Sequence, residues 1–422
     1  MTRHHARSDT SPSGLPRGAG AALRKLAACA WLLLACAGVG PARAAEPACA
    51  VADWWLWPLF VEHFVQADGR VLDASTPQRQ STSEGQSYAM FFALAANDRD
   101  TFERLWRWSV DNLAGGDVER NLPAWLWGRK DDGSWGVIDA NPASDADLWF
   151  IYSLLEAGER WQRQDYREDA LRLLRNVEQR EVAELPGLGR MLLPGPQGFA
   201  MPDRLWLLNP SYLPLPLLRR LQRASPQGPW EEIAAALPRL LRESAPQGFA
   251  PDWVGYRAVA PQRGVFVESS LKGGQGSYDA IRTYLWAGLA APRDPQAALV
   301  LQALAGMATA VAADGVPPER VDVARGDRQG QGPFGFSAAL VPYLRALEQP
   351  WLAELQERRA LDELRRSLDP QRLEAQPPPY YNFVLSLFAL GWSERQYRFL
   401  PDGGLELGWE AACPRGDGAA SR

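Results

Sequence analysis

The sequence of 422 residues has few histidines, three in all, and few lysines. His4 and His5 lie in an N-terminal segment that we expect to be removed, which leaves His63 in an expected helix. One histidine cannot build a multi-histidine zinc or iron site, which needs several imidazole or thiolate ligands. Neither a Walker loop nor a Gly-x-Gly-x-x-Gly motif after a strand is present, so phosphate-bearing cofactors are not expected. An enzyme of this composition must transfer protons with Asp and Glu, without metal or cofactor.

The N-terminus has the pattern of an export signal. Five basic residues precede an apolar run from Leu26 to Val39, and Ala42-Arg43-Ala44 follows as a cleavage pattern. The run is shorter than the roughly 20 residues that span a membrane. We therefore expect residues 1–44 to be a cleaved signal peptide and the mature chain to be periplasmic or secreted, without a transmembrane segment. The alternative is a lipoprotein signal acylated at Cys36, although Leu34 suits that pattern poorly.

Two of the four cysteines, Cys29 and Cys36, belong to the expected signal. Cys49 and Cys413 remain, near opposite ends of the mature chain. Exported proteins with two cysteines usually pair them. Because the termini of compact domains are often close together, we predict a Cys49–Cys413 disulfide. Two separate buried thiols are the alternative.

The expected mature chain is acidic. It has 39 Lys and Arg against 49 Asp and Glu, so its net charge is about −10. Nucleic acid requires a positive surface and is not an expected partner. Residues 45–422 have no Pro/Gly/Ser linker, and we expect a single domain. Several tryptophans stand among polar residues and glycine, as at Trp125, Trp127 and Trp135, which favours an aromatic cleft suited to sugar rings.

Helical periodicity predominates over strand alternation. We expect twelve amphipathic helices, over 50–66, 83–97, 99–114, 144–162, 165–183, 209–223, 229–243, 277–290, 294–313, 334–347, 350–368 and 379–391. A long connection precedes each second helix, and short connections follow, which predicts six helical hairpins in series. In each hairpin the second helix is apolar on most faces, whereas the first helix carries a charged face. We therefore expect the second helices to form an inner ring and the first helices an outer ring. The predicted fold is an all-α (α/α)6 toroid.

Carboxylates stand at the start of three inner helices. They are Glu84 in the helix over 83–97, Asp145 and Asp147 in the helix over 144–162, and Asp279 in the helix over 277–290. Each alone has a structural explanation, since the helix dipole favours acids there. With Ser83, Ser144 and Ser277 as expected N-caps, the acids are free to face a central cleft. Two carboxylates that flank a glycosidic bond are what its hydrolysis needs.

Motifs around these acids carry a family resemblance. They are 82–88 (Thr-Ser-Glu-Gly-Gln-Ser-Tyr), 143–149 (Ala-Ser-Asp-Ala-Asp-Leu-Trp), 122–130 (Leu-Pro-Ala-Trp-Leu-Trp-Gly-Arg-Lys), 209–214 (Asn-Pro-Ser-Tyr-Leu-Pro), 277–282 (Ser-Tyr-Asp-Ala-Ile-Arg) and 335–339 (Gly-Phe-Ser-Ala-Ala). Nearly all of the expected mature chain resembles glycoside hydrolase family 8. The resemblance implies an (α/α)6 barrel and endo-acting, inverting hydrolysis of β-1,4-glucan. It also implies association with a bacterial cellulose synthase or export complex.

The resemblance implies roles for individual residues. Glu84 is the expected general acid, Asp279 the expected base that activates water, and Asp145 the residue expected to hold and distort the sugar, whereas Asp147 is expected to be structural. Arg282, one turn after Asp279, is expected to keep that base ionised. The expected sugar contacts are Tyr88, Trp125, Trp127, Tyr212, Tyr278 and Tyr381.

Other functions remain open at this stage. Chitosan, xylan and mixed-linkage glucan are alternative substrates, and a non-catalytic glucan-binding subunit of an export complex is an alternative of another class. The toroid also hosts lyases and epimerases, since fold alone does not decide function. The mature chain has only Lys130 and Lys272 as lysines and a negative charge, which disfavours a lyase of acidic sugars. An epimerase would need histidine pairs, which the mature chain does not contain.

Overall fold

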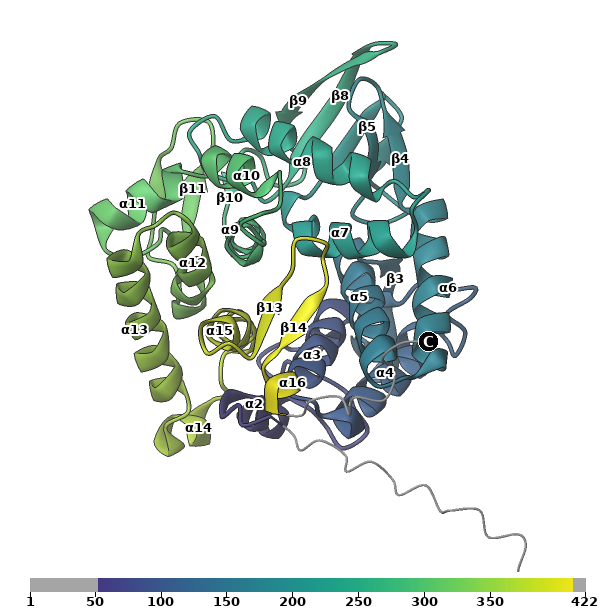
Figure 1. The fold of residues 1–422 in the computed structure, drawn as a ribbon, viewed down its shortest axis with the longest axis vertical. Helices are drawn as coiled ribbons and strands as arrows, with labels where there is room; N and C mark the ends of the chain where they lie inside the picture. Colours follow the sequence, from purple (N-terminus) through teal and green to yellow (C-terminus); the bar gives the residue numbers. More distant parts are fainter. Residues whose placement is uncertain (1–51, 413–422) are drawn as a thin grey trace, which may run out of the picture. The chain divides into compact units, whose positions relative to one another are not determined.

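The structure is a computed structural model that describes residues 52–412. The expected signal peptide, the alternative lipid site at Cys36 and the predicted Cys49–Cys413 disulfide lie outside these residues. The inner helices are α3 (Ser83–Ala95), α5 (Ser144–Arg160), α7 (Leu215–Ala224), α9 (Ala280–Leu289), α12 (Phe334–Ala346) and α15 (Tyr380–Ser393). The outer helices are α2 (Leu56–Phe64), α4 (Arg99–Leu113), α6 (Gln164–Arg180), α8 (Trp230–Ser244), the pair α10 (Ala297–Ala303) and α11 (Gly306–Asp314), and α13 (Pro350–Ser367). Inner and outer helices alternate along the chain, and Figure 1 shows the two rings; the predicted six-hairpin toroid is confirmed.

Burial separates the two rings as the sequence pattern predicts. Every residue of α3 is buried except Glu84, and every residue of α9 is buried. The outer helix α4 instead buries one stripe, with Phe102, Leu105 and Ser109 at spacings of three and four residues. The inner helices are therefore held by packing on all sides, and the single partly exposed side chain of α3 lies where the helix begins.

Aromatic side chains close the inner ring. The ring centroids of Phe91 and Trp149 are 4.9 Å apart, which joins α3 to α5, and those of Trp149 and Trp286 are 5.3 Å apart, which joins α5 to α9. Phe388 of α15 lies 5.0 Å from Trp286 and 4.6 Å from Phe92 of α3. Such edge and tilted contacts add to the stabilisation from buried area. The interior of the toroid is thus a packed core.

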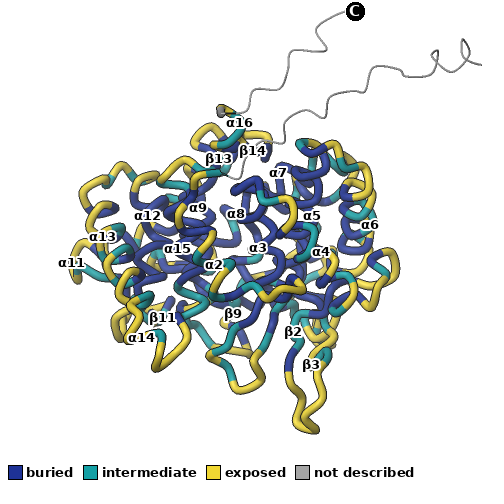
Figure 2. The backbone as a smooth tube through the Cα atoms, turned by 90° about the horizontal axis from the view of Figure 1, so that it is seen from below, coloured by how far each residue is buried: buried dark blue, intermediate teal, exposed yellow. Residues whose placement is uncertain are grey.

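Short strands fill the long connections. They are β1 (Ser81–Thr82), β2 (Ala124–Arg129), β3 (Trp135–Pro142), β4 (Val182–Leu185), β5 (Gly189–Leu192), β6 (Ala200–Met201), β7 (Leu205–Leu208), β8 (Val254–Ala260), β9 (Arg263–Glu268), β10 (Gln275–Gly276), β11 (Arg320–Asp322) and β12 (Arg328–Gln329). All their pairings are antiparallel, in the sheets β1-β2-β3, β4-β5, β6-β7-β8-β9 and β10-β11-β12. Figure 2 shows β2, β3, β9 and β11 at one end of the barrel, which we call the open end.

A hairpin of β13 (Tyr397–Phe399) and β14 (Leu405–Leu407), followed by α16 (Gly408–Ala412), covers the opposite end, which we call the closed end (Figure 2). Phe399 stacks on Phe91 at 5.9 Å, and the Tyr152 hydroxyl donates to the carbonyl of Gly403 over 3.0 Å. Gly403 has a φ of +78°, and a Cβ there would lie 2.3 Å from the Arg220 nitrogen. A glycine is therefore required where the hairpin turns against α7.

Several expected helix bounds were wrong. The expected helix over 209–223 is a short 3-10 turn, η1 (Pro210–Tyr212), followed by α7, because proline at 214 cannot continue the turn. The expected helix over 294–313 is α10 and α11, bent by 53°. At that bend a Cβ on Gly306 would lie 2.2 Å from the Gln247 carbonyl, so the chain turns where it packs closely on a loop.

Further helical differences are an N-terminal helix that begins at Leu56 and a short additional helix, α14 (Pro370–Ala375). Within residues 52–412, no single helix is long and apolar enough to cross a membrane. The bent pair α10 and α11 meets that test together, by length and composition only.

Candidate active site

Three of the predicted carboxylates meet at the open end around one guanidinium. Glu84 lies in the first turn of α3, Asp145 in the first turn of α5, and Asp279 at the N-cap position of α9. The Arg282 Nη2 atom lies 3.4 Å from Asp279 Oδ1 and 3.7 Å from Asp145 Oδ2. The Arg282 charge also acts on Glu84. Starts of three inner helices therefore converge on Arg282, as their common direction predicts.

Asp279 receives donors from three directions. Trp253 Nε1 and Lys272 Nζ each donate to its Oδ2 over 3.0 Å, and Arg282 donates to its Oδ1. Two of the three donors are cationic, and charge-assisted hydrogen bonds of this kind suit an ionised carboxylate. The expected contact between Arg282 and Asp279 is present, and Lys272 and Trp253 add two that the sequence did not indicate.

Burial favours the protonated form of the other two acids. Burial raises the pKa of Glu84; the Arg282 charge opposes that rise, and the Asp279 charge adds to it. Asp145 is only 1% exposed, and burial, with the Glu84 charge, raises its pKa to about 8. The Tyr88 hydroxyl lies 3.4 Å from Asp145 Oδ2 as a donor. One site thus holds two acids that favour the protonated form and one held by cations, which is the division that acid–base catalysis requires.

The expected serine caps were wrong at all three helices. Thr82 caps α3, since its hydroxyl accepts from the Gly85 nitrogen over 3.0 Å. Helix α5 follows Ala143 and has no side-chain cap, and the Ser144 hydroxyl has no partner among residues 52–412. At α9 the Ser277 hydroxyl donates instead to the Glu319 carbonyl. Backbone geometry decides the cap, because Thr82 is the extended residue before α3 whereas Asp279 already has helical angles.

Beside Glu84 lies a cavity of about 230 Å³. Its lining includes Tyr88, Arg282, Tyr380 and Tyr381. A Cβ at Gly85 would lie 2.5 Å from the Tyr380 hydroxyl, so the glycine after Glu84 makes room for that phenol. The cavity adjoins an acid, a cation and aromatic rings, which is the character of a sugar-binding site.

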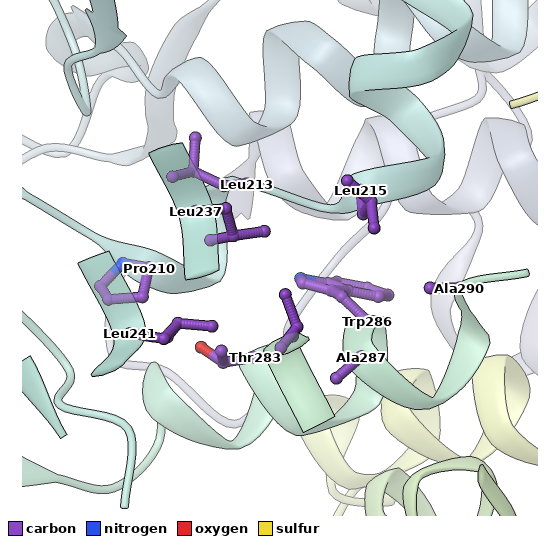
Figure 3. A pocket seen from close by; sticks show the side chains of 10 residues that line it. Pro210, Leu213, Leu215, Leu237, Leu241, Thr283, Trp286, Ala287 and Ala290 are labelled. Atoms are coloured by element: carbon purple, nitrogen blue, oxygen red, sulfur yellow. The ribbon is translucent and has the colours of Figure 1, made fainter. Parts of the chain in front are cut away.

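A second pocket, shown in Figure 3, is unrelated to these acids. Its volume is about 10 Å³, and leucine, alanine, proline and tryptophan side chains line most of it. Thr283 supplies the one side-chain hydroxyl in the view of Figure 3, and this hydroxyl has no partner among residues 52–412. This pocket is a packing gap between α7, α8 and α9.

The predicted aromatic contacts fall into separate groups. Trp127 of β2 stacks on Trp135 at 5.5 Å, and the Arg70 guanidinium lies 4.4 Å from the Trp127 ring. Ser81 pairs with Trp127 in the sheet, which brings this stack beside the start of α3. Trp125 is half-buried on β2 and does not line the cavity.

The other aromatics stand near Asp279. The Tyr212 ring lies 5.9 Å from the Arg282 guanidinium, and the Tyr381 hydroxyl donates to the Tyr278 carbonyl over 2.6 Å. Tyr278 is 43% exposed and packs at 5.1 Å against Phe336. Aromatic side chains therefore stand near Asp279 and Arg282 as well as beside the start of α3.

Asp147 pairs with Glu181 rather than with Arg282, although the charges of Asp145 and Glu84 also act on it. Asp147 and Glu181 are fully buried, and within residues 52–412 no residue outside this pair donates an N–H or O–H to any of their four oxygens. Burial raises the pKa of both, and a hydrogen bond between the two carboxyls, which needs a proton on one of them, lowers that of Asp147. Within the same residues, no group of three His, Cys, Asp or Glu side chains is arranged to hold a metal ion.

Glycoside hydrolases use a protonated carboxyl group and an ionised carboxylate on either side of the bond that they cleave. The carboxyl groups at the open end of this toroid, beside aromatic side chains, fit that class of enzyme. The sequence matches the model of glycosyl hydrolases family 8 over residues 27–395, and the chain belongs to this family. It is 48% identical to an endoglucanase of Pseudomonas fluorescens over 86% of this chain and 92% of the relative. An endoglucanase of Xanthomonas axonopodis is 47% identical over 91% of this chain and 97% of the relative.

A solved structure shares the architecture. The endo-1,4-D-glucanase of Vibrio fischeri superposes with a TM-score of 0.77 at 40% identity, over 85% of this chain and 99% of the other. The family resemblance predicted from the sequence motifs is confirmed.

Proposed function

We propose that this chain is an endo-1,4-β-glucanase that hydrolyses cellulose chains with inversion at the anomeric carbon. The arrangement of Glu84, Asp145 and Asp279 around Arg282 carries the proposal. Relatives of 43–48% identity named endoglucanases support β-1,4-glucan as the substrate.

In the proposed reaction Glu84 is the general acid. Its raised pKa keeps a proton available, and the carboxyl donates that proton to the glycosidic oxygen as the bond to the anomeric carbon breaks. Asp279 accepts a proton from the water that attacks the anomeric carbon from the opposite face. The reaction consumes one water; Glu84 regains a proton from solvent and Asp279 releases one, which restores both groups.

Asp145 is proposed to hold the sugar at the cleavage point. With a pKa of about 8 it is largely neutral at pH 7, so it can donate to a sugar hydroxyl as well as accept from one. The Tyr88 hydroxyl and the Arg282 guanidinium lie 3.4 Å and 3.7 Å from Asp145 Oδ2 and so orient the carboxyl group. A neutral Asp145 also limits the negative charge beside Asp279.

The aromatic groups are proposed to bind the glucan on both sides of the acids. Trp127 with Trp135 forms one platform, and Tyr212, Tyr278 and Tyr381 lie on the side of Asp279. Flat rings suit the apolar faces of glucose units, and their polar groups remain able to bind hydroxyls.

The chain is further proposed to act in the periplasm or outside the cell, beside a cellulose synthase or export complex. The export pattern of residues 1–44 and the family resemblance support this place. Mass spectrometry of the native protein distinguishes the two signals, since cleavage after Ala44 leaves an unmodified chain and the lipoprotein alternative leaves an acylated Cys36.

The test is an NMR time course of the mature protein on a short cello-oligosaccharide, with Glu84→Gln as the control. New α-anomer that appears before mutarotation is expected, and it supports both hydrolysis and inversion. New β-anomer would keep the substrate but require a covalent nucleophile. No cleavage, with cleavage of chitosan, xylan or mixed-linkage oligomers, would replace cellulose by that substrate. Binding without cleavage of any of them would favour the glucan-binding subunit.

A further inference from the structure

Asp279 stands at the N-cap position of α9 but does not cap it. Its backbone angles are helical, with φ −77° and ψ −48°, and its side chain forms no cap hydrogen bond. The first N–H groups of a helix have no partner within the helix. A buried helix that carries a reactive carboxylate at this position therefore needs a cap from elsewhere.

Asp252 supplies that cap from a connection 27 residues upstream. Its Oδ1 accepts from the backbone nitrogens of Ser277 over 2.7 Å, Asp279 over 3.1 Å and Ala280 over 2.8 Å. Asp252 is 1% exposed, so these bonds form away from solvent. Hydrogen bonds from backbone N–H groups to a carboxylate are among the stronger ones in proteins.

The segment that carries Asp252 is itself fixed. The Asp252 nitrogen donates to the Gln275 carbonyl over 2.8 Å, and the nearby Ala250 nitrogen donates to the Tyr284 hydroxyl of α9 over 2.8 Å. The next residue, Trp253, donates from its indole to Asp279 Oδ2. Adjacent residues thus hold Asp279 twice, Asp252 by the main chain and Trp253 by the side chain.

We propose that Asp252 is a positioning residue that fixes the start of α9 and so aims Asp279 at the attacking water. This inference rests on the proposed function of Asp279 as the general base. Misplacement of a catalytic group by about 1 Å can cost on the order of 100-fold in rate. Asp252 touches no substrate atom in this scheme, and its effect is exerted through Asp279.

The test compares Asp252→Ala with Asp98→Ala. Asp98 caps the outer helix α4, where its Oδ1 accepts from the Thr101 nitrogen over 3.0 Å, and α4 carries none of the three carboxylates. Both changes remove a cap and are expected to lower the unfolding temperature. Only Asp252→Ala is expected to lower kcat, by about 10- to 100-fold with KM within about twofold. Equal kcat for the folded Asp252→Ala and wild-type enzymes would overturn the proposal.

Two further variants keep the outcome decisive. Asp252→Asn keeps an acceptor oxygen without the charge, so kcat is expected to fall only about two- to fivefold. If Asp252→Ala does not fold, an unchanged kcat in Asp252→Asn overturns the proposal. In an Asp279→Asn background, Asp252→Ala is expected to cause no further loss, whereas a full additional loss would show that Asp252 acts elsewhere. Wild-type activity of Asp279→Asn alone would instead refute the proposed base.

Discussion

The two ends of the barrel treat buried charge differently. At the closed end Glu156 is 1% exposed and lies between two guanidiniums, 2.5 Å from Arg220 and 2.7 Å from Arg160. Arg220 also pairs with Glu159, and Arg160 with Glu410. Each of these charges faces an opposite charge at the junction of α5, α7 and α16, so removal of one partner would leave a buried charge less compensated.

At the open end Glu84, Asp145 and Asp279 share two nearby cations, Arg282 and Lys272. Arg282 is the one cation near both Asp145 and Glu84, and Asp147 with Glu181 has no donor from outside the pair among the described residues 52–412. Unneutralised carboxyls raise one another's pKa, which holds protons ready for transfer but weakens the fold. We therefore expect loss of a charge at the closed end to lower stability and loss of a charge at the open end to lower activity.

The largest expected effect is on catalysis at the open end. We expect Glu84→Gln to lower kcat by about 10²- to 10⁴-fold, because the amide has no proton to donate. Its unfolding temperature should stay the same or rise, because one crowded carboxyl is removed. Hydrolysis of a soluble cellulose derivative and thermal unfolding measure the two quantities. Wild-type kcat would remove Glu84 from the mechanism, and a large fall in stability would break the comparison.

The matching change at the closed end should have the opposite profile. Glu156→Gln removes the buried carboxylate that two guanidiniums share and leaves them with the more exposed Glu159 and Glu410, and loss of one member of a buried pair costs about 3–5 kcal/mol. We expect a free energy of unfolding lower by that amount, measured in urea, with kcat per folded molecule unchanged. Glu159→Gln is the control, because Glu159 is 39% exposed and should cost less than about 1 kcal/mol. Equal losses in the two variants would contradict the expectation.

The sequence predicted the rings and the open end because both follow from local periodicity. Helices that are apolar on all faces, such as α3 and α9, are distinguishable from α4 by pattern alone. Since the inner helices share one direction, the acids at their starts lie at the same end of the barrel. Glu84, Asp145 and Asp279 were predictable as one group for this reason.

The sequence predicted Arg282 beside Asp279 but not the other residues that support this carboxylate. Asp252, Trp253 and Lys272 lie in a long connection without periodicity, and the sheet of β8 and β9 with the β10 pairing brings them to α9. Long-range register of this kind leaves no local signal. The hairpin at the closed end does have a local sequence signal, because Pro401-Asp402-Gly403-Gly404 is a turn sequence between two apolar stretches.

A smaller effect is expected from the Asp147 and Glu181 pair. Both acids have pKa values raised by burial, so the folded state binds more protons than the unfolded state above pH ~4, and stability falls as pH rises. Asp147→Asn removes one such group and introduces an amide donor for Glu181. We expect a gain in unfolding free energy that grows from pH 5 to pH 8 and reaches on the order of 1 kcal/mol, about the value of one pKa unit.

Urea denaturation at pH 5, 6.5 and 8 measures this gain. Asp131→Asn is the control, since Asp131 lies in the exposed turn between β2 and β3 and should change stability little at any pH. A loss of stability at pH 8 in Asp147→Asn would mean that the pair is ionised and partnered in the folded protein. The open end would then resemble the closed end.

The smallest expected effect concerns the aromatic platform at the open end. Trp135 is 47% exposed, so Trp135→Ala should change the unfolding free energy by less than about 1 kcal/mol. If its ring binds glucan, loss of about 1 kcal/mol of binding raises KM about fivefold on long cello-oligosaccharides, with kcat unchanged. Trp351→Ala on the outer helix α13 removes a ring that is 61% exposed and should leave KM unchanged. A rise in KM for both variants would mean that exposed tryptophans bind glucan wherever they lie. Glucan binding by tryptophan would then not be specific to the open end.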